Sequence, residues 1–232
     1  MDADLIPPPE PVRLPVLDEQ GACLGYFPVG RVFCVGRNYA AHARELGHDP
    51  AREPPFFFMK PASAVVRGDR VAYPPATSDL HHEVELVVAL GASPRTAAPS
   101  AAREAVLACG VGVDLTRRDL QAEAKRLGRP WEIAKAFDGA APCGALRGGG
   151  ACLEDPERTL RLTVDGELRQ EGSLGQMIWS PEEILVRLCE LFGLRPGDLV
   201  FTGTPAGVGP LQRGQVVRAE VDGLPSLAFR VG

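Results

Sequence analysis

The 232-residue sequence has little lysine, few aromatic residues and no long apolar run. The longest apolar runs, such as Leu86 to Leu90, have five residues, whereas a membrane-spanning helix needs about 20. The N-terminus, residues 1–11, is acidic and rich in proline, and it lacks the basic start and apolar core of a signal peptide. We therefore expect a cytoplasmic protein without a membrane partner.

Excess positive charge is also absent. The 25 basic and 30 acidic residues give a formal net charge of −5, which makes the chain a poor binder of polyanions. We therefore expect no nucleic-acid partner. Only three basic residues are lysines, so a lysine in an apolar segment is conspicuous, and Lys60 and Lys135 are the two such cases.

The six cysteines include no Cys-x-x-Cys pair, and most lie in apolar runs. In a chain of this length without a signal sequence, this pattern predicts reduced, buried side chains rather than a zinc or disulfide framework. The positions are Cys23, Cys34, Cys109, Cys143, Cys152 and Cys189.

Glycine and proline, by contrast, are abundant, with 26 and 22 copies. Helical bundles and coiled coils need long proline-free runs, so this composition disfavours both. Short predicted strands outnumber scattered helices, which indicates a β-rich α+β fold. We expect a small variable appendage at residues 1–30 and one catalytic domain at residues 31–232.

Local sequence signals predict the positions of the helices, strands and turns. Asp165-Gly166 is a strong hairpin signal, Arg67-Gly68-Asp69 suggests a second hairpin, and Ser180 begins a capping box with proline at the first helical position. Asn38 is a candidate cap for a helix that Gly47 would end. Strands are predicted at 13–17, 22–26, 31–35, 56–59, 83–90, 110–114, 160–164, 167–169, 199–202, 216–221 and 227–231, and helices at 39–46, 100–109, 116–127 and 181–192.

Two carboxylates mark the first candidate site. Side chains alternate along a strand, so Glu83 and Glu85 share one face, about 7 Å apart at their bases. Hard oxygen ligands of this kind suit Mg²⁺, Mn²⁺ or Ca²⁺, although the same spacing is common on a solvated strand face. His81 shares the face as a ligand or as a hydrogen-bonding neighbour. Asp114 ends the strand at 110–114, where it either completes a three-carboxylate set or caps the following helix.

Two further segments contain residues that could take part in catalysis or ligand binding. His42 and Glu45 are three residues apart on one helix face, and a carboxylate beside an imidazole orients it as a general base. An ordinary surface pair has the same spacing. The glycine-rich loop at residues 201–209 could bind a carboxylate through its backbone N–H groups, or could be a simple turn.

The order of the motifs is more specific than any one of them. The series resembles the fumarylacetoacetate hydrolase family, and most of all its short single-domain branch of acylpyruvate hydrolases, oxaloacetate decarboxylases and hydroxyheptadienedioate isomerases. The motifs are G-R-N-Y-x-x-H-x-x-E (36–45), F-x-K-P (58–61), H-H-E-x-E-L (81–86), D-L-T-x-R-D-x-Q (114–121), W-x-x-A-K-x-F-D (131–138) and T-G-T-P-x-G-V-G (202–209).

The resemblance implies a mixed β-sandwich roll, usually a homodimer. It implies that Glu83, Glu85 and Asp114 hold one Mg²⁺ or Mn²⁺, and that Lys135 stabilises negative charge beside the ion. His42 and Glu45 would activate water from a short helix that acts as a lid. Contacts to substrate carboxylate or keto oxygens would come from Arg37, Lys60, Arg118, Gln121 and Thr204.

The implied chemistry is a Lewis-acid reaction of 2-oxo acids with a 4-carbonyl group. The ion would stabilise the pyruvate enolate that forms when a bond to C3 breaks. Such a site can hydrolyse the C3–C4 bond of acylpyruvates, and it can decarboxylate or tautomerise oxaloacetate. The alternatives are an isomerase or decarboxylase of aromatic catabolism, acting on longer unsaturated dicarboxylates, and a metal-dependent binding module without turnover.

Overall fold

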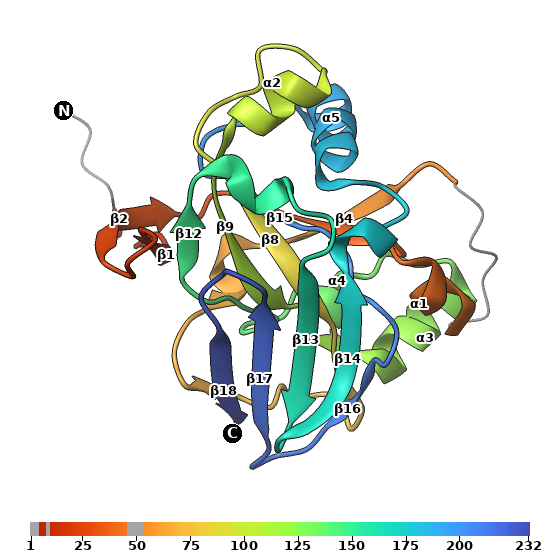
Figure 1. Cartoon of the computed structure of the whole chain (residues 1–232). Coiled ribbons are helices and arrows are strands. Elements are labelled where there is room, and N and C mark those ends of the chain that lie inside the picture. Colours follow the sequence, from red (N-terminus) through yellow and green to blue (C-terminus); the bar gives the residue numbers. More distant parts are fainter. Residues whose placement is uncertain (1–4, 8–9, 46–52) are drawn as a thin grey trace.

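The computed structural model describes residues 5–7, 10–45 and 53–232 (Figure 1). Two sheets form the body of the molecule. The larger has eight strands in the order β2-β1-β12-β9-β8-β15-β3-β4, and the smaller has five in the order β14-β13-β17-β18-β6. The strands of the larger sheet are β1 Arg13–Leu17, β2 Cys23–Pro28, β3 Val32–Gly36, β4 Phe56–Lys60, β8 Val84–Leu90, β9 Val106–Val113, β12 Leu146–Gly148 and β15 Leu199–Phe201.

The remaining strands and the helices surround this sheet. The five-stranded sheet consists of β6 Arg70–Val71, β13 Thr159–Val164, β14 Glu167–Ser173, β17 Val216–Val221 and β18 Leu227–Val231. Smaller sheets contain β5 Val65–Val66 with β11 Ala141–Pro142, and β7 Leu80–His82 with β10 Thr116–Arg117 and β16 Gly209–Leu211. The helices are α1 Ala40–Glu45, α2 Pro99–Glu104, α3 Arg118–Leu127, α4 Glu132–Lys135 and α5 Pro181–Phe192, with short 3-10 helices at Ala62–Ala64, Gly150–Leu153 and Leu174–Gln176.

The core lies on both faces of the larger sheet. Every residue of β8 is buried, which explains its nearly continuous apolar sequence. Because side chains alternate, Leu86, Val88 and Leu90 pack toward the five-stranded sheet and α5, while Val87 and Ala89 join a second cluster on the opposite face. The expected β-rich α+β sandwich roll is confirmed.

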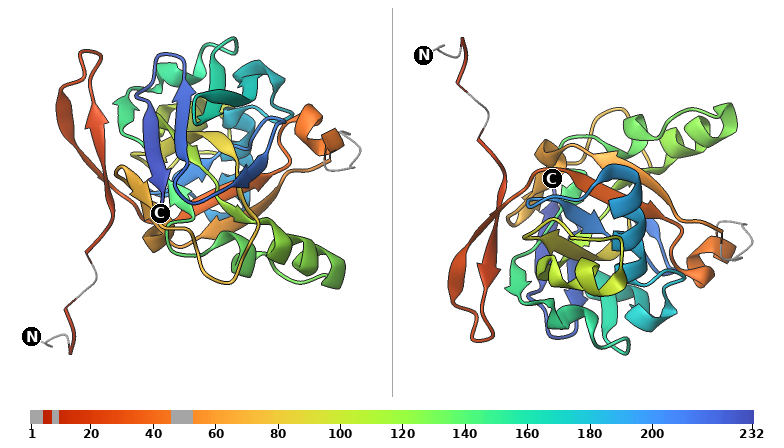
Figure 2. Two further views of the ribbon diagram at one scale, coloured as in Figure 1. Left: turned by 90° about the horizontal axis from the view of Figure 1, so that it is seen from below. Right: turned by 90° about the horizontal axis from the view of Figure 1, so that it is seen from above.

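Figure 2 shows from two sides that the β1–β2 hairpin projects beside the body of the molecule. β1 pairs in parallel with β12, so the predicted N-terminal appendage extends the edge of the larger sheet. None of the helices in the described part of the chain has the length and apolar character that crossing a membrane requires.

Several local predictions are wrong. The helix expected at 100–109 ends at Glu104, because the next residues pair with β8 as strand β9. The segment at 65–73 is not a hairpin, since β5 pairs with β11 and β6 with β18. The helix expected from Thr116 begins at Arg118, with Arg117 as its cap, so Asp114 does not cap it. The expected end of α1 at Leu46 and Gly47 lies outside the described residues.

The cysteine prediction is also wrong. Cys109 in β9 and Cys152 in the 3-10 helix at Gly150–Leu153 form a disulfide, although 43 residues separate them in sequence. Cys34 and Cys143 are free and buried, as predicted, but Cys23 is exposed. The pairing of β12 with β9 brings the two bonded cysteines to the same side of the sheet, and spacing in the sequence carries no sign of that pairing.

Candidate active site

Three acidic side chains from distant positions meet at one end of β8 and β9. Val84 and Val113 are partners in the antiparallel ladder, and the Asp114 N–H donates to the Glu83 carbonyl oxygen at 2.7 Å. Glu83 therefore lies opposite Asp114, the residue that follows β9, and Glu85 lies opposite Gly112, two residues earlier. Each of Glu83, Glu85 and Asp114 offers one oxygen, these oxygens lie within 4.8 Å of one another, and all three residues are buried.

Cationic side chains hold two of these carboxylates. The Lys135 ammonium lies 2.7 Å from Glu83 Oε2 and 2.7 Å from Asp114 Oδ2. Arg118 donates to Glu83 Oε1 at 2.5 Å, and the Lys60 ammonium lies 2.8 Å from Asp114 Oδ1. Burial opposes ionisation of Glu83, but Lys135 and Arg118 outweigh it and hold the pKa of Glu83 well below its usual range. Burial likewise disfavours charge on Lys135, but Asp114 and Glu83 raise its pKa.

Glu85 differs from its two neighbours. Its carboxylate accepts the Gly203 N–H at 2.6 Å, and no cationic side chain of the described residues pairs with it. Burial and the nearby charges of Asp114 and Glu83 raise its pKa well above the ordinary value. An ionised carboxylate that is buried in these surroundings costs folding free energy unless a cation binds it. The donor set, three hard carboxylates that include one unpaired, fits Mg²⁺ or Mn²⁺.

The histidine–glutamate pair lies at the edge of the same pocket. His42 Nδ1 is 3.2 Å from Glu45 Oε2, and Glu45 also accepts the Gly207 N–H. Burial lowers the pKa of His42, although Glu83 and Glu45 partly offset that effect. Neutral imidazole that donates its Nδ1 proton to Glu45 keeps the lone pair on Nε2, so His42 is equipped as a base.

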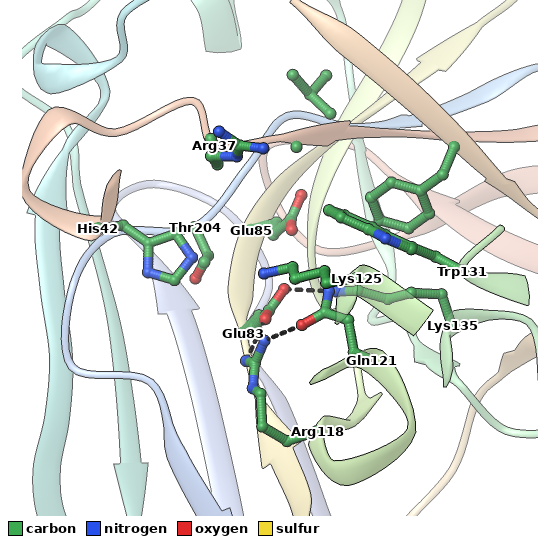
Figure 3. A pocket seen from close by; sticks show the side chains of 13 residues that line it. Arg37, His42, Glu83, Glu85, Arg118, Gln121, Lys125, Trp131, Lys135 and Thr204 are labelled. Carbon is green, nitrogen blue, oxygen red and sulfur yellow. Dashed lines mark hydrogen bonds and ion pairs between the residues drawn. The ribbon is translucent and has the colours of Figure 1, made fainter. Parts of the chain in front are cut away.

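The pocket gathers most of the residues that the sequence singled out (Figure 3). Its cavity volume is about 20 Å³, and it opens to solvent. The lining includes Arg37, His42, Glu83, Glu85, Arg118, Gln121, Lys135 and Thr204, together with Phe58, Lys125 and Trp131.

Lys60 lies outside the pocket lining and is almost fully buried. Besides its ion pair with Asp114, its ammonium donates to the backbone carbonyls of Leu115 and Lys135. This position does not support the expected contact with substrate, and instead lets Lys60 orient Asp114 and the end of α4. The position of Lys60 in an apolar segment correctly marked this lysine as unusual, but the sequence did not indicate that Asp114 is its partner.

Sequence reasoning missed several residues. Lys125 lies one turn after Gln121 on α3, and Trp131 packs beside it, with the Lys125 ammonium 5.2 Å from the ring centroid. Gln170 on β14 donates to Thr204 Oγ1 at 2.8 Å and accepts the Val84 N–H at 3.0 Å. It therefore ties the five-stranded sheet to the site.

Two expected roles take a different form. Asn38 does not act as the expected helix cap through its side chain, which bonds the backbone of Trp179 and Thr202. His81 forms a hydrogen bond with Asp79 at 2.9 Å and does not belong to the cluster of candidate metal ligands. It is therefore a hydrogen-bonding neighbour rather than a ligand.

The arrangement of an acidic cluster, a buried lysine and a histidine–glutamate pair around one pocket is typical of an enzyme active site. Residues 31–232 match the family model described as fumarylacetoacetate (FAA) hydrolase C-terminal. The chain belongs to the fumarylacetoacetate hydrolase family, and it is an enzyme of the short, single-domain branch.

Similar proteins match most of the length of this chain. The chain is 43% identical to the oxaloacetate tautomerase YcgM of Escherichia coli (strain K12) over 91% of its own length and 96% of that protein. It is 38% identical to the human mitochondrial oxaloacetate tautomerase FAHD1 over 86% and 90% of the two chains. The crystal structure of a fumarylpyruvate hydrolase from Pseudomonas aeruginosa, in complex with Mn²⁺ and pyruvate, has 47% identity and a TM-score of 0.91, with 99% of both chains covered.

Proposed function

We propose that this protein is a divalent-metal-dependent enzyme for 2-oxo acids that carry a 4-carbonyl group. Its principal reaction is hydrolysis of the C3–C4 bond of acylpyruvates, and the same site tautomerises or decarboxylates oxaloacetate. The observation that carries the proposal is that Asp114 clusters with Glu83 and Glu85, and that these two glutamates line the pocket together with His42. Similarity to a fumarylpyruvate hydrolase and to oxaloacetate tautomerases supports the substrate class.

Glu83, Glu85 and Asp114 would hold the Mg²⁺ or Mn²⁺ ion. The ion would supply Lewis acidity to the carboxylate and keto oxygens of a bound 2-oxo acid. A relative with 47% identity is described in complex with Mn²⁺ and pyruvate, which supports both the ion and the chelating group.

The chain's own residues perform the proton chemistry. His42 takes a proton from the water that attacks the C4 carbonyl, and Glu45 fixes the orientation of the ring through Nδ1. Lys135 uses two of its three N–H groups on Glu83 and Asp114, so one remains for the oxygen that gains negative charge. Arg37, Gln121 and Thr204 line the pocket and would contact substrate oxygens, together with Arg118.

The reactions differ in their need for water. Hydrolysis requires a water molecule at C4 and therefore a base, whereas tautomerisation only moves a proton between carbon and oxygen.

The second candidate function is that of an isomerase of longer unsaturated dicarboxylates. A 5-carboxymethyl-2-hydroxymuconate delta-isomerase from Mycobacterium smegmatis shares 32% identity at a TM-score of 0.74, which is a weaker likeness. A binding module without turnover would not need the His42–Glu45 pair.

Three further properties belong to the proposal. The catalytic part is residues 31–232, with the β1–β2 hairpin as an addition to its sheet. The protein acts as a homodimer in the cytoplasm, and its partners are small organic acids rather than nucleic acids.

The proposal is tested by turnover of acetylpyruvate, fumarylpyruvate, oxaloacetate and 2-hydroxyhepta-2,4-diene-1,7-dioate with Mg²⁺ and with Mn²⁺. We expect acylpyruvate hydrolysis to be fastest. Because only hydrolysis needs an activated water, His42→Ala should lower it by about 10²–10⁴-fold and affect oxaloacetate tautomerisation much less. A preference for the heptadienedioate, or equal losses in both reactions, would contradict the assignment.

A further inference from the structure

The pocket has more positive charge than its carboxylates require. Four cationic side chains line it and Lys60 lies behind it, against four carboxylates when Asp114 and Glu45 beside the pocket are included, and a divalent cation would add two more positive charges. Three of the five are engaged: Lys60 pairs with Asp114, Arg118 with Glu83, and Lys135 with both. Within the described part of the chain, Arg37 and Lys125 have no carboxylate partner.

Lys125 is placed to meet a ligand from the rim. It lies four residues after Gln121 on α3, so both side chains project from the same helix face toward the pocket. Figure 3 shows Lys125 among the side chains that line the pocket, and its ammonium lies over the Trp131 ring. Lys125 is exposed, as are its neighbours Glu123 and Arg126, but of the three only Lys125 lines the pocket.

The surroundings of Lys125 favour an anion. Partial burial, followed by the positive charges of Arg118 and Arg37, lowers its pKa, and the carboxylate of Glu83 only partly offsets this effect. The ammonium therefore lies where cations already repel one another. The Trp131 ring lies 5.2 Å from the Lys125 ammonium and attracts it through its π face, but it carries no formal negative charge. A carboxylate at this position would reduce the repulsion and give the ammonium a charge-assisted hydrogen bond.

We propose that Lys125 is a specificity-determining residue that binds a second, distal carboxylate of the substrate. The preferred substrates are then acylpyruvates whose acyl chain ends in a carboxylate, rather than those with a neutral acyl group. The inference rests on the proposed function, because the acidic cluster must hold the 2-oxo acid end of the substrate while Lys125 binds the carboxylate at the other end. A lysine suits this task since its flexible stem lets a point charge follow chains of different length.

The test compares fumarylpyruvate, which has the distal carboxylate, with acetylpyruvate, which lacks it. Lys125→Met should lower kcat/KM for fumarylpyruvate by about 10- to 100-fold, mainly through KM, because a charge-assisted hydrogen bond is lost. The same variant should keep kcat/KM for acetylpyruvate and the inhibition constant of pyruvate within about twofold. Lys125→Arg should recover part of the fumarylpyruvate activity. Arg126→Gln removes an equal charge one position along α3 and should behave like the wild type.

The outcomes separate the inference from the function. Equal losses on both substrates would overturn the inference, because Lys125 would then act on atoms that the substrates share. Unchanged kinetics on both would also overturn it. Absence of turnover of either substrate by the wild-type enzyme would overturn the proposed function itself, and with it the specificity assigned to Lys125.

Discussion

At the scale of single residues, Glu83 and Glu85 show how neighbours on one strand face acquire different properties. Lys135 and Arg118 stabilise the Glu83 carboxylate, whereas Glu85 has the Gly203 N–H and no cationic side chain among the described residues. Glu83 therefore contributes stability as an anion. The raised pKa of Glu85 means that its ionised form costs stability once the pH rises above its unfolded value of about 4.5.

This contrast predicts opposite effects of two matched substitutions. In chelator at pH 7, Glu83→Gln should lower stability by about 3–5 kcal/mol, since it removes the carboxylate partner of Arg118 and one of the two carboxylate partners of buried Lys135. Glu85→Gln should leave the melting temperature equal to or above that of the wild type, and should remove the stabilisation that Mn²⁺ gives the wild type. Thermal unfolding with and without Mn²⁺ measures both, and equal destabilisation by the two substitutions would contradict the assignment.

The pH dependence of hydrolysis follows from His42. Burial lowers its pKa below the ordinary 6.5, so the imidazole is neutral at pH 7 and the rate should fall only as the pH drops below 6.5. Glu45 raises the pKa of His42, so Glu45→Gln should move the acid limb of the kcat/KM profile to still lower pH, besides reducing the rate. An acid limb that stays in place or moves upward in this variant would exclude His42 as the base.

At the scale of elements, the loop at residues 202–209 connects the two halves of the site. The Gly203 N–H bonds Glu85, and the Gly207 N–H bonds Glu45. Gly203 has a φ of +99°, and a Cβ there would lie 2.6 Å from the Cβ of Asn38. The glycine is therefore required both by its backbone conformation and by the close approach of Asn38.

Gly203→Ala should accordingly reduce both stability and hydrolysis, because the loop must shift and move its N–H away from Glu85. Gly214→Ala is the matched control, since Gly214 has a φ of +89° but open space around its Cα. The control should cost about 1 kcal/mol in stability and leave kcat unchanged. Comparable loss of activity in both variants would show that general strain, and not the loop's contact with Glu85, is responsible.

The elements that the sequence predicted well have strong local signals. Asp165-Gly166 connects β13 and β14 as a hairpin, and Ser180 accepts the Glu183 N–H at the start of α5. The wrong predictions all depend on partners far away in the chain. Residues 106–109 are strand because β8 lies beside them, and the Cys109–Cys152 disulfide follows from the pairing of β12 with β9. Helix propensity and cysteine spacing contain no information on those partners.

At the scale of the whole molecule, the antiparallel pairing of β8 and β9 explains why the acidic cluster could be predicted. Strand alternation placed Glu83 and Glu85 on one face, the strand end left Asp114 as a third carboxylate or a helix cap, and the order of motifs favoured the third carboxylate. Lys60 and Lys125 show the limit of that reasoning. The motif identified Lys60 without revealing that it lies behind Asp114, and no motif identified Lys125 at the pocket rim.

The central claim is that three converging carboxylates hold a catalytic divalent cation. The most direct measurement is Mn²⁺ titration of chelator-treated protein, followed by calorimetry and by fumarylpyruvate hydrolysis, in the wild type and in Asp114→Ala. The exposed α3 variant Glu123→Ala serves as the control. We predict one tight Mn²⁺ site per chain whose filling restores activity in the wild type and the control, and loss of both in Asp114→Ala. Full activity in metal-free protein, or undiminished Mn²⁺ binding by Asp114→Ala, would contradict the account.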